Sequence, residues 1–185
     1  DQARADFERG VAVSRRVGIS SFLPYTLIYR GLMHLHAGAW AAATQDLEEV
    51  VALVEHGGNL ELLREAQSFL AEHDLLTGRP EAAHARLASL LDQFDLEEMN
   101  VTWLLPTLAW SLLELDDITS AAEVAGQTVR RARMQTLQLV LVDALRVQAM
   151  VAIRLERWDD AVHDLEEGLA LARDMPYPYA EGRLL

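Results

Sequence analysis

The sequence predicts an all-α fold in which pairs of helices stack along the chain. Small residues occur in pairs twelve apart, and the pairs recur at intervals of 40, 38 and 40 residues. A fixed period of this length is typical of a solenoid of helix pairs. A small residue is needed where two helices cross closely, because a larger side chain would hold their axes apart. The pairs are Gly31 with Ala43, Ala71 with Ala83, Ala109 with Ala121, and Ala149 with Ala161.

The period divides the chain into a single repeat domain with incomplete repeats at both ends. We expect four repeats at about 21–58, 59–98, 99–135 and 136–175, and partial repeats at 1–20 and 176–185. Counting back forty residues from Ala43 reaches Ala3, with Phe7 four residues later, so the chain is expected to begin in a second helix. The residues from 176 onward resemble a first helix that is cut short. These features predict a piece of a longer protein.

Turn signals separate the two predicted helices of each repeat. Gly38 lies in the turn at 36–40 and Gly78 in the turn at 77–80, where Pro80 suits the first position of a helix. Acidic residues mark the corresponding turns at 115–119 and 156–160. Loops between repeats are expected at 56–59 and around 95–100. Pro106 falls within the first helix of the third repeat, so that helix is expected to kink or to start late.

Composition limits the classes of function. Hydrophobic residues make up 51% of the 185 residues and charged residues 24%, which is typical of a folded protein. All sixteen basic residues are arginine, and 29 acidic residues bring the net charge to −13, which opposes direct contact of this segment with nucleic acid. The apolar stretches are too short to span a membrane. No secretion leader opens the sequence, so we expect a cytoplasmic protein, although the absence of cysteine would also suit an exported one.

The repeat positions resemble those of the tetratricopeptide repeat. The features that carry the resemblance are a small residue in the first helix, Trp40 or Trp158 before the second, alanine twelve residues on, and an apolar residue four residues later. That last residue is Leu47, Leu87, Ala125 or Leu165. The family repeat has about 34 residues, so the helices here are expected to be longer. The resemblance implies a right-handed superhelix with a concave groove lined by first helices.

Segments near the end of the chain resemble a particular group of repeat proteins. They are WDDA at 158–161, LALAR at 169–173 and PYPY at 176–179. Together with the arginine, alanine and leucine bias, they resemble the repeat region of large ATP-dependent bacterial transcriptional regulators of the LuxR and maltose-regulator type. The resemblance implies a sensor for an inducer or an inhibitory protein, flanked by a nucleotide-binding module and a helix-turn-helix.

Helical projection places aromatic residues on the groove face of three first helices and cations on the fourth. Tyr and Trp offer a large rigid contact area, and Arg can hold a carboxylate or phosphate with two hydrogen bonds. We therefore expect a protein or peptide partner, or an anionic small-molecule inducer. Alternatively, the tryptophans pack against neighbouring helices and the arginines pair with Glu114 or Asp143. The candidate residues are Tyr25, Tyr29, His36, Phe69, Glu72, Trp103, Trp110, Arg146, Met150 and Arg154.

The sequence does not favour an enzyme. His34 and His36 are two residues apart and point to different sides of a helix, unlike a metal-binding pair. A glycine-rich phosphate loop, a nucleophile elbow and cysteine are all missing, so no catalytic residue, cofactor or metal is expected. The sequence predicts a non-catalytic binding module of a larger regulator. The alternatives are a constitutive scaffold or adaptor, which mediates complex assembly or self-association as a homo-oligomer, and an accessory domain of a signalling ATPase or cyclase.

Overall fold

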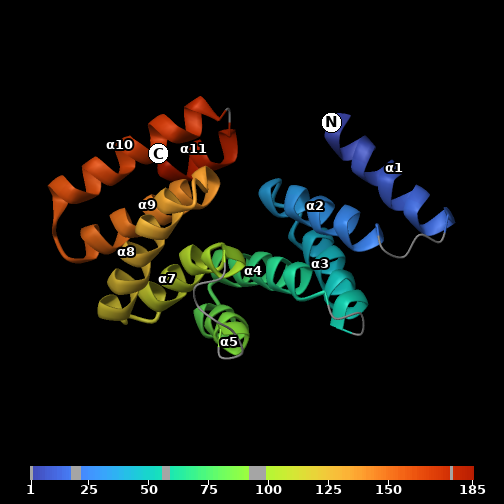
Figure 1. Cartoon of the computed structure of the whole chain (residues 1–185), viewed down its shortest axis with the longest axis horizontal. Helices are drawn as coiled ribbons and strands as arrows, with labels where there is room; N and C mark the ends of the chain where they lie inside the picture. The colour runs from blue at the N-terminus through green and yellow to red at the C-terminus, as the bar shows by residue number, and fades with distance from the viewer. Residues whose placement is uncertain (1, 18–21, 56–58, 92–98, 176) are drawn as a thin grey trace. The chain divides into compact units, whose positions relative to one another are not determined.

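The computed structural model describes residues 2–17, 22–55, 59–91, 99–175 and 177–185, and every regular element in these ranges is a helix (Figure 1). None of these helices is long and apolar enough to cross a membrane. The all-α prediction is confirmed. The helices are α1 (Gln2–Val17), α2 (Leu23–His36), α3 (Trp40–Glu55), α4 (Leu60–Leu76), α5 (Pro80–Leu91), α6 (Met99–Thr102), α7 (Leu105–Glu114), α8 (Ile118–Met134), α9 (Gln138–Arg154), α10 (Trp158–Asp174) and α11 (Pro178–Leu184).

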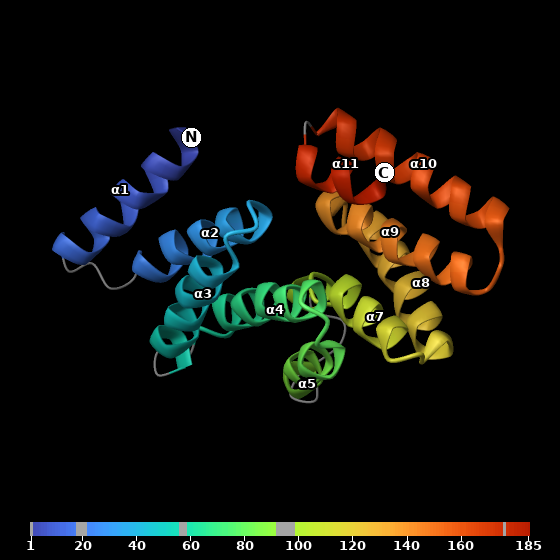
Figure 2. The same cartoon turned by 180° about the vertical axis from the view of Figure 1, so that it is seen from behind.

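The chain forms two compact units, which we call unit 1 (residues 1–78) and unit 2 (residues 79–185). The boundary falls in the Gly78 turn, inside the second predicted repeat. In unit 1, α2 packs against α1, α3 and α4. In unit 2, α7 packs against α8 and α9, and α11 packs against α9 and α10 (Figure 2). In both units, consecutive first helices therefore lie against one another.

The helix crossings explain the small residues. The alanines of the four predicted pairs are at most 3% exposed. Gly31 of α2 lies so close to α3 that an added Cβ would be 2.9 Å from Cγ of Leu47. Leu47 itself is fully buried in the core of unit 1. The contact of Gly31 with Leu47 confirms the steric reason for a small residue at the first crossing.

The four turns inside the repeats share one backbone conformation. Gly38, Gly78, Asp116 and Glu156 have φ values of +72°, +74°, +65° and +56°, and they recur with the same steps of 40, 38 and 40 residues. In each turn the N–H of this residue donates to a carbonyl three residues earlier, at 3.1 Å. The left-handed residue ends the first helix and satisfies one of its last carbonyl groups. All four predicted turns are confirmed, and Pro80 begins α5 as expected.

The remaining local predictions concern Pro106 and the two loops between repeats. α7 starts late, at Leu105, and places Pro106 in its first turn, where the missing N–H removes no helical hydrogen bond. Asn59 caps α4, because its side chain accepts a hydrogen bond from the N–H of Leu62 at 3.2 Å. The rest of the predicted loop at 56–59 lies outside the described residues. So does most of the loop around 95–100, whose last residues belong to α6.

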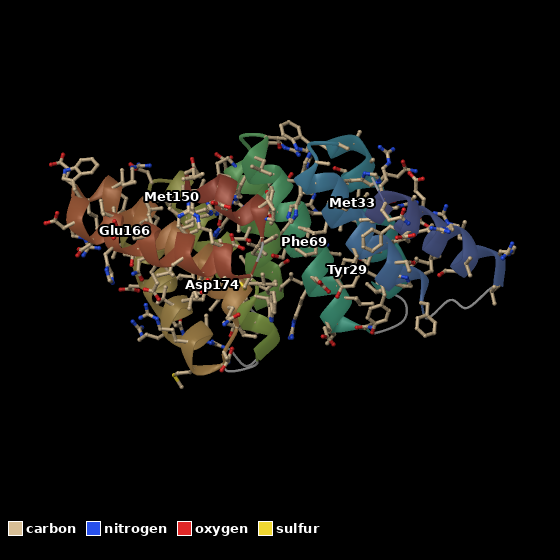
Figure 3. The ribbon with its side chains drawn as sticks, turned by 90° about the horizontal axis from the view of Figure 1, so that it is seen from above. Tyr29, Met33, Phe69, Met150, Glu166 and Asp174 are labelled. Atoms are coloured by element: carbon tan, nitrogen blue, oxygen red, sulfur yellow. The ribbon has the colours of Figure 1, made fainter. Side chains whose placement is uncertain are left out.

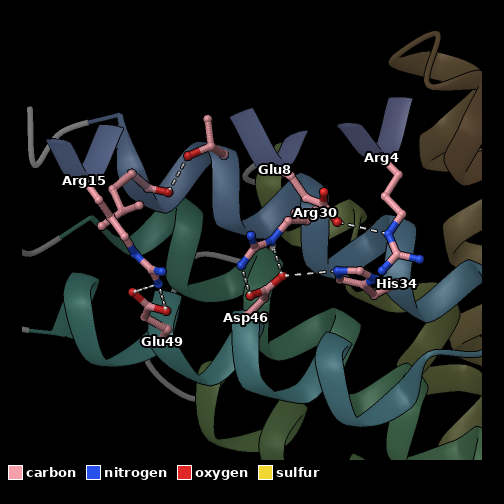
Figure 4. Close-up of polar contacts among 9 residues, drawn as sticks. Arg4, Glu8, Arg15, Arg30, His34, Asp46 and Glu49 are labelled. Carbon is pink, nitrogen blue, oxygen red and sulfur yellow. Dashed lines mark hydrogen bonds and ion pairs between the residues drawn. The ribbon is translucent and has the colours of Figure 1, made fainter. Parts of the chain in front are cut away.

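An ion pair supports the assignment of α1 as a second helix. Arg15 of α1 holds Glu49 of α3 with two hydrogen bonds of 2.6 and 2.8 Å (Figure 4). Arg133 of α8 holds Glu167 of α10 in the same way, at 2.7 and 2.9 Å. Both pairs join residues 34 apart and link one second helix to the next. Because α1 makes the contact that α8 makes, it has the second-helix role that the period predicts.

Candidate binding surface

A cluster of arginine and aromatic side chains forms on the first helices of unit 2. The ring of Trp110 on α7 has the guanidinium carbon of Arg146, on α9, 4.6 Å from its centre. The guanidinium carbon of Arg183, on α11, is 5.0 Å from the same ring centre. Arg183 also lies 5.5 Å from the ring of Tyr179. Three successive first helices thus bring two cations and two aromatic rings together, and we call these four residues the Trp110 cluster.

The carboxylates of Asp143 and Glu114 border the Trp110 cluster. Oδ1 of Asp143 is 3.9 Å from Nε of Arg146 and 3.9 Å from Nη1 of Arg183. The indole Nε1 of Trp110 donates a hydrogen bond to Glu114 at 3.0 Å, which fixes the plane of the ring. Guanidinium groups over an indole ring are attracted by its negative face. The ring of Trp110 and the carboxylate of Asp143 thus hold the two guanidinium groups side by side.

The side chains of Arg146 and Arg183 are mostly buried, unlike those of arginines at an open surface. The Arg146 side chain is 10% exposed and the Arg183 side chain 15%. Trp110 is 9% exposed, so the ring supports the guanidinium groups and offers little surface of its own. A charge–charge contact made here would be less screened by water than one made at an open surface.

The other candidate residues of unit 2 are Met150, Arg154 and Trp103, and they lie in three different surroundings. The sulfur of Met150 is 3.1 Å from Nη1 of Arg146, so Met150 lies beside the Trp110 cluster. Arg154 forms an ion pair with Asp116 in the turn after α7, away from the two carboxylates expected for it. Trp103 is 46% exposed and lies in the turn between α6 and α7. The helix is interrupted there, so Trp103 and Trp110 do not belong to one continuous helix.

Unit 1 carries a second surface, aromatic and acidic, on α2 and α4. Tyr25 and Tyr29 of α2 are 44% and 47% exposed, and Phe69 of α4 is half-buried against the core. Figure 3 labels Tyr29, Met33 and Phe69 over these two helices. The charge of Glu65 raises the pKa of Tyr29, with burial and Glu61 adding to the effect. Burial, followed by the charge of Glu61, raises the pKa of Glu65.

The other two candidate residues of unit 1, His36 and Glu72, expose less of their side chains at the surface of α2 and α4 than Tyr25 and Tyr29 do. His36 is the last residue of α2 and is half-buried, and Glu72 is half-buried on α4. Both have polar or electrostatic partners within the chain. Within the described residues, the His, Asp and Glu side chains form no group of three that could hold a metal ion.

Sequence reasoning missed Arg183 and Tyr179. A signal for Arg183 was available, because counting back forty residues from Arg183 reaches Asp143 on the inward side of α9. The projection stopped at the fourth first helix and left α11 out. The observed cluster needs α11, since Arg183 and Tyr179 both belong to it.

Comparison with known proteins identifies the architecture. The chain is similar to a crystal structure of a Podosopora anserina putative kinesin light chain with nearly identical TPR-like repeats. The similarity covers 95% of this chain and 87% of that chain, with a TM-score of 0.62 and 18% sequence identity. The fold is a TPR-like array of helix pairs. No protein-family model matches the sequence, and no curated protein matches it. The similarity to the TPR-like structure therefore concerns the fold.

Proposed function

We propose that this chain is a non-catalytic protein-binding module whose first helices hold an acidic segment of a partner. The TPR-like fold supports a binding role, because a solenoid presents an extended surface and gathers few residues at one point. The Trp110 cluster carries the proposal. It combines buried aromatic support with two guanidinium groups, the residue types that dominate interface energetics.

The geometry suggests how the partner is held. Each guanidinium group can donate two parallel hydrogen bonds to a carboxylate, which gives orientation as well as affinity. Trp110 and Tyr179 hold the two cations on one face, so less side-chain freedom is lost on binding. Tyr25 and Tyr29 of unit 1 offer a separate contact area for an uncharged or basic part of a partner.

We further propose that the module is the sensor of a larger cytoplasmic bacterial transcriptional regulator of the LuxR and maltose-regulator type. This part of the proposal rests on the sequence segments at 158–161, 169–173 and 176–179. A partner or inducer that binds one arrangement of the helix pairs more tightly than another would shift the population toward it. Flanking modules would then respond to that shift.

The test is a selection of displayed random peptides on the folded chain. We expect the selected peptides to be acidic and to bind Arg146→Gln/Arg183→Gln at least about tenfold more weakly, which is about 1.4 kcal/mol. The lysine double variant R146K/R183K should bind with intermediate affinity, because lysine keeps the charge and loses the two-pronged geometry. Circular dichroism melting curves check that each variant is folded.

The matched control changes two arginines of unit 2 outside the cluster, Arg130→Gln/Arg157→Gln. Both residues are exposed, one on α8 and one at the start of α10. This variant should bind the selected peptides as the parent does. Peptides that tolerate R146Q/R183Q, or a selection that yields no binder, would contradict the proposed function.

A further inference from the structure

Glu65 of α4 is a half-buried carboxylate next to a second acidic residue. Burial, followed by the charge of Glu61 one helical turn earlier, raises its pKa. Among the residues that the structure describes, no side chain forms a hydrogen bond or an ion pair with Glu65. Arg64, its neighbour in the sequence, points to a different side of the helix and has a polar or electrostatic partner of its own. A carboxylate that is partly removed from water in this way is stabilised by a cation.

An exposed tyrosine of α2 lies near this carboxylate. The charge of Glu65 raises the pKa of Tyr29 more than burial does, so the phenol and the carboxylate are close enough to interact. α2 packs against α4 within unit 1, and Tyr25 extends the exposed aromatic surface by one turn of α2 (Figure 3, where Tyr29 is labelled). The face of an aromatic ring and a carboxylate both attract a cation. The two helices thus present two groups that suit the same kind of ligand.

The equivalent positions of unit 2 show how the chain itself can balance a charge at this place. Arg183 is the equivalent of Glu65, 118 residues later, and Asp143 is the equivalent of Tyr25. Oδ1 of Asp143 on α9 is 3.9 Å from Nη1 of Arg183 on α11. The neighbouring first helix therefore supplies the opposite charge in unit 2.

The described part of unit 1 does not supply this balance. One turn before Arg183, unit 2 has the ring of Tyr179, 5.5 Å from the guanidinium carbon. One turn before Glu65, unit 1 has Glu61, which carries the same charge, and two carboxylates at this spacing on a helix repel each other. Across the helix pair, Tyr25 brings an uncharged ring in place of Asp143. The group that would balance unit 1 as unit 2 is balanced is a cation.

We propose that the α2–α4 surface of unit 1 binds an arginine in a basic segment of a partner protein. The carboxylates of Glu61 and Glu65 accept hydrogen bonds from the guanidinium group, and the ring of Tyr29 packs against its face. Arginine suits the surface better than lysine, because its planar group pairs with a carboxylate and stacks on a ring at the same time. The net charge of −13 steers a basic partner toward the chain.

This inference rests on the proposed function as a protein-binding module and adds a contact of opposite sign to the Trp110 cluster. The test therefore selects displayed random peptides on the R146Q/R183Q variant, in which the two guanidinium groups of the cluster are absent. We expect the selected peptides to be rich in arginine. One of them, labelled with fluorescein, then serves as the probe in fluorescence anisotropy with the same variant.

Substitutions on α2 and α4 separate the contributions of charge and ring. In the R146Q/R183Q background, Glu61→Gln/Glu65→Gln should weaken binding of the probe at least about tenfold. Tyr29→Ala should weaken binding about fivefold, as expected for a cation held against an exposed ring. Tyr29→Phe keeps the ring and should bind within about twofold of the background variant.

The peptide provides a second check on the same contact. Each arginine of the probe is replaced in turn by citrulline, which keeps the shape of the side chain and loses its charge. One of these replacements should weaken binding about as much as E61Q/E65Q does. It should add little further loss in E61Q/E65Q, because both changes remove the same contact. Fully additive losses at every arginine would overturn the proposal.

The matched control is Glu48→Gln/Glu55→Gln, which removes two charges from exposed positions on α3 of the same unit. This variant should bind the probe within about twofold of the background variant. E61Q/E65Q should melt no lower than the background variant, because it removes a like-charge pair. A large loss of stability in E61Q/E65Q would show that the fold needs these carboxylates and would overturn the proposal.

Three further results would overturn the proposal. They are selected peptides without arginine, a loss of binding in E48Q/E55Q as large as in E61Q/E65Q, and self-association in sedimentation that E61Q/E65Q abolishes. In the last case the arginine would come from a second copy of the chain. Acidic peptides selected on the parent, with no arginine-rich peptides on R146Q/R183Q, would overturn this inference alone and leave the proposed function in place.

Discussion

The helix pairs α2–α3 of unit 1 and α9–α10 of unit 2 are built on the same plan with different buried polar contacts. In α2–α3, Arg30 donates to the buried Asp46 at 2.6 and 2.7 Å, with His34 at 3.9 Å (Figure 4). In α9–α10, Gln148 donates to the buried Asp164 at 3.0 Å to both oxygens. All four residues occupy equivalent positions, 118 residues apart. One repeat position therefore accepts either an ionic or a neutral partner for a buried aspartate.

The pairs also differ at the crossing and in the turn. Gly31 in the first pair corresponds to Ala149 in the second, and Gly38 corresponds to Glu156. The glycines suit close contact with Leu47 and a left-handed backbone, respectively. The second pair achieves the same fold with non-glycine residues at both positions. The two pairs therefore share an architecture that follows from the spacing of the repeat positions along the chain. Each pair is stabilised by its own local contacts.

Loss of the charged donor should have the largest effect on stability. Arg30→Met leaves the Asp46 carboxylate, whose side chain is 5% exposed, without its guanidinium partner. We expect a loss of about 3 kcal/mol in the free energy of unfolding, because an uncompensated buried charge is costly. The equivalent variant Gln148→Met should lose about 1.5 kcal/mol. Urea denaturation measures both, with hydrogen exchange in α3 and α10 locating the change. A larger loss in Q148M would break the comparison.

A single methyl group at the crossing should be the next largest effect. Gly31→Ala places a Cβ 2.9 Å from Cγ of the buried Leu47, so α2 and α3 must move apart or Leu47 must change rotamer. We expect a loss of about 1–3 kcal/mol, although alanine favours helix formation. Ala149→Gly should lose about 1 kcal/mol through helix propensity alone. Thermal melting of both variants compares the two crossings. Stabilisation by G31A would show that the contact is looser than the structure indicates.

A substitution in the turn of the second pair should have a smaller effect on stability, in the stabilising direction. Glu156→Gly should stabilise the chain by up to about 1 kcal/mol, because glycine adopts a φ of +56° without the strain of a side chain. Gly38→Glu in the equivalent turn should destabilise the chain by a similar amount. Thermal melting of the two variants gives shifts of opposite sign. Equal signs would mean that the two turns are not equivalent.

The smallest effect should be the pH dependence that comes from Asp164. Burial raises the pKa of Asp164, although the hydrogen bond from Gln148 partly opposes the shift. As the pH falls through this raised pKa toward the ordinary value, the folded carboxyl takes up a proton before the unfolded one, so stability rises. Asp164→Asn should remove this slope and retain the fold. Asp46→Asn should instead lower stability at neutral pH, because Arg30 loses its anionic partner. Urea midpoints measured from acidic to neutral pH test both expectations.

The fold was predictable from the sequence to a large extent. Gly31, Ala43 and the other small residues marked the crossings, and Gly38 and Gly78 marked two turns. The candidate surface was predictable only in part. Trp110 and Arg146 were named from the helical projection, and the structure brings their side chains together. The binding roles of all ten candidates remain predictions.

Trp103 and Arg154 have surroundings in the structure that differ from those expected from the sequence, for a similar physical reason. Trp103 depends on where the helix breaks before Pro106, and Arg154 depends on a turn that presents Asp116. A helix break and a turn interrupt the helical period, whereas a helical projection treats every helix as continuous. Arg183 needed the projection to continue into the last, short helix.

The repeat, the small residues at the helix crossings and the turns could be read from the sequence alone. These features depend on spacing along one chain, because helical periodicity and the need for small residues at a crossing act over a dozen residues. Which charged and aromatic side chains meet depends on how the helices pack in three dimensions. Trp110 and Arg183 are separated by 73 residues, and they become neighbours because α7, α9 and α11 pack in succession. Such convergence depends on packing between helices, which no local pattern specifies.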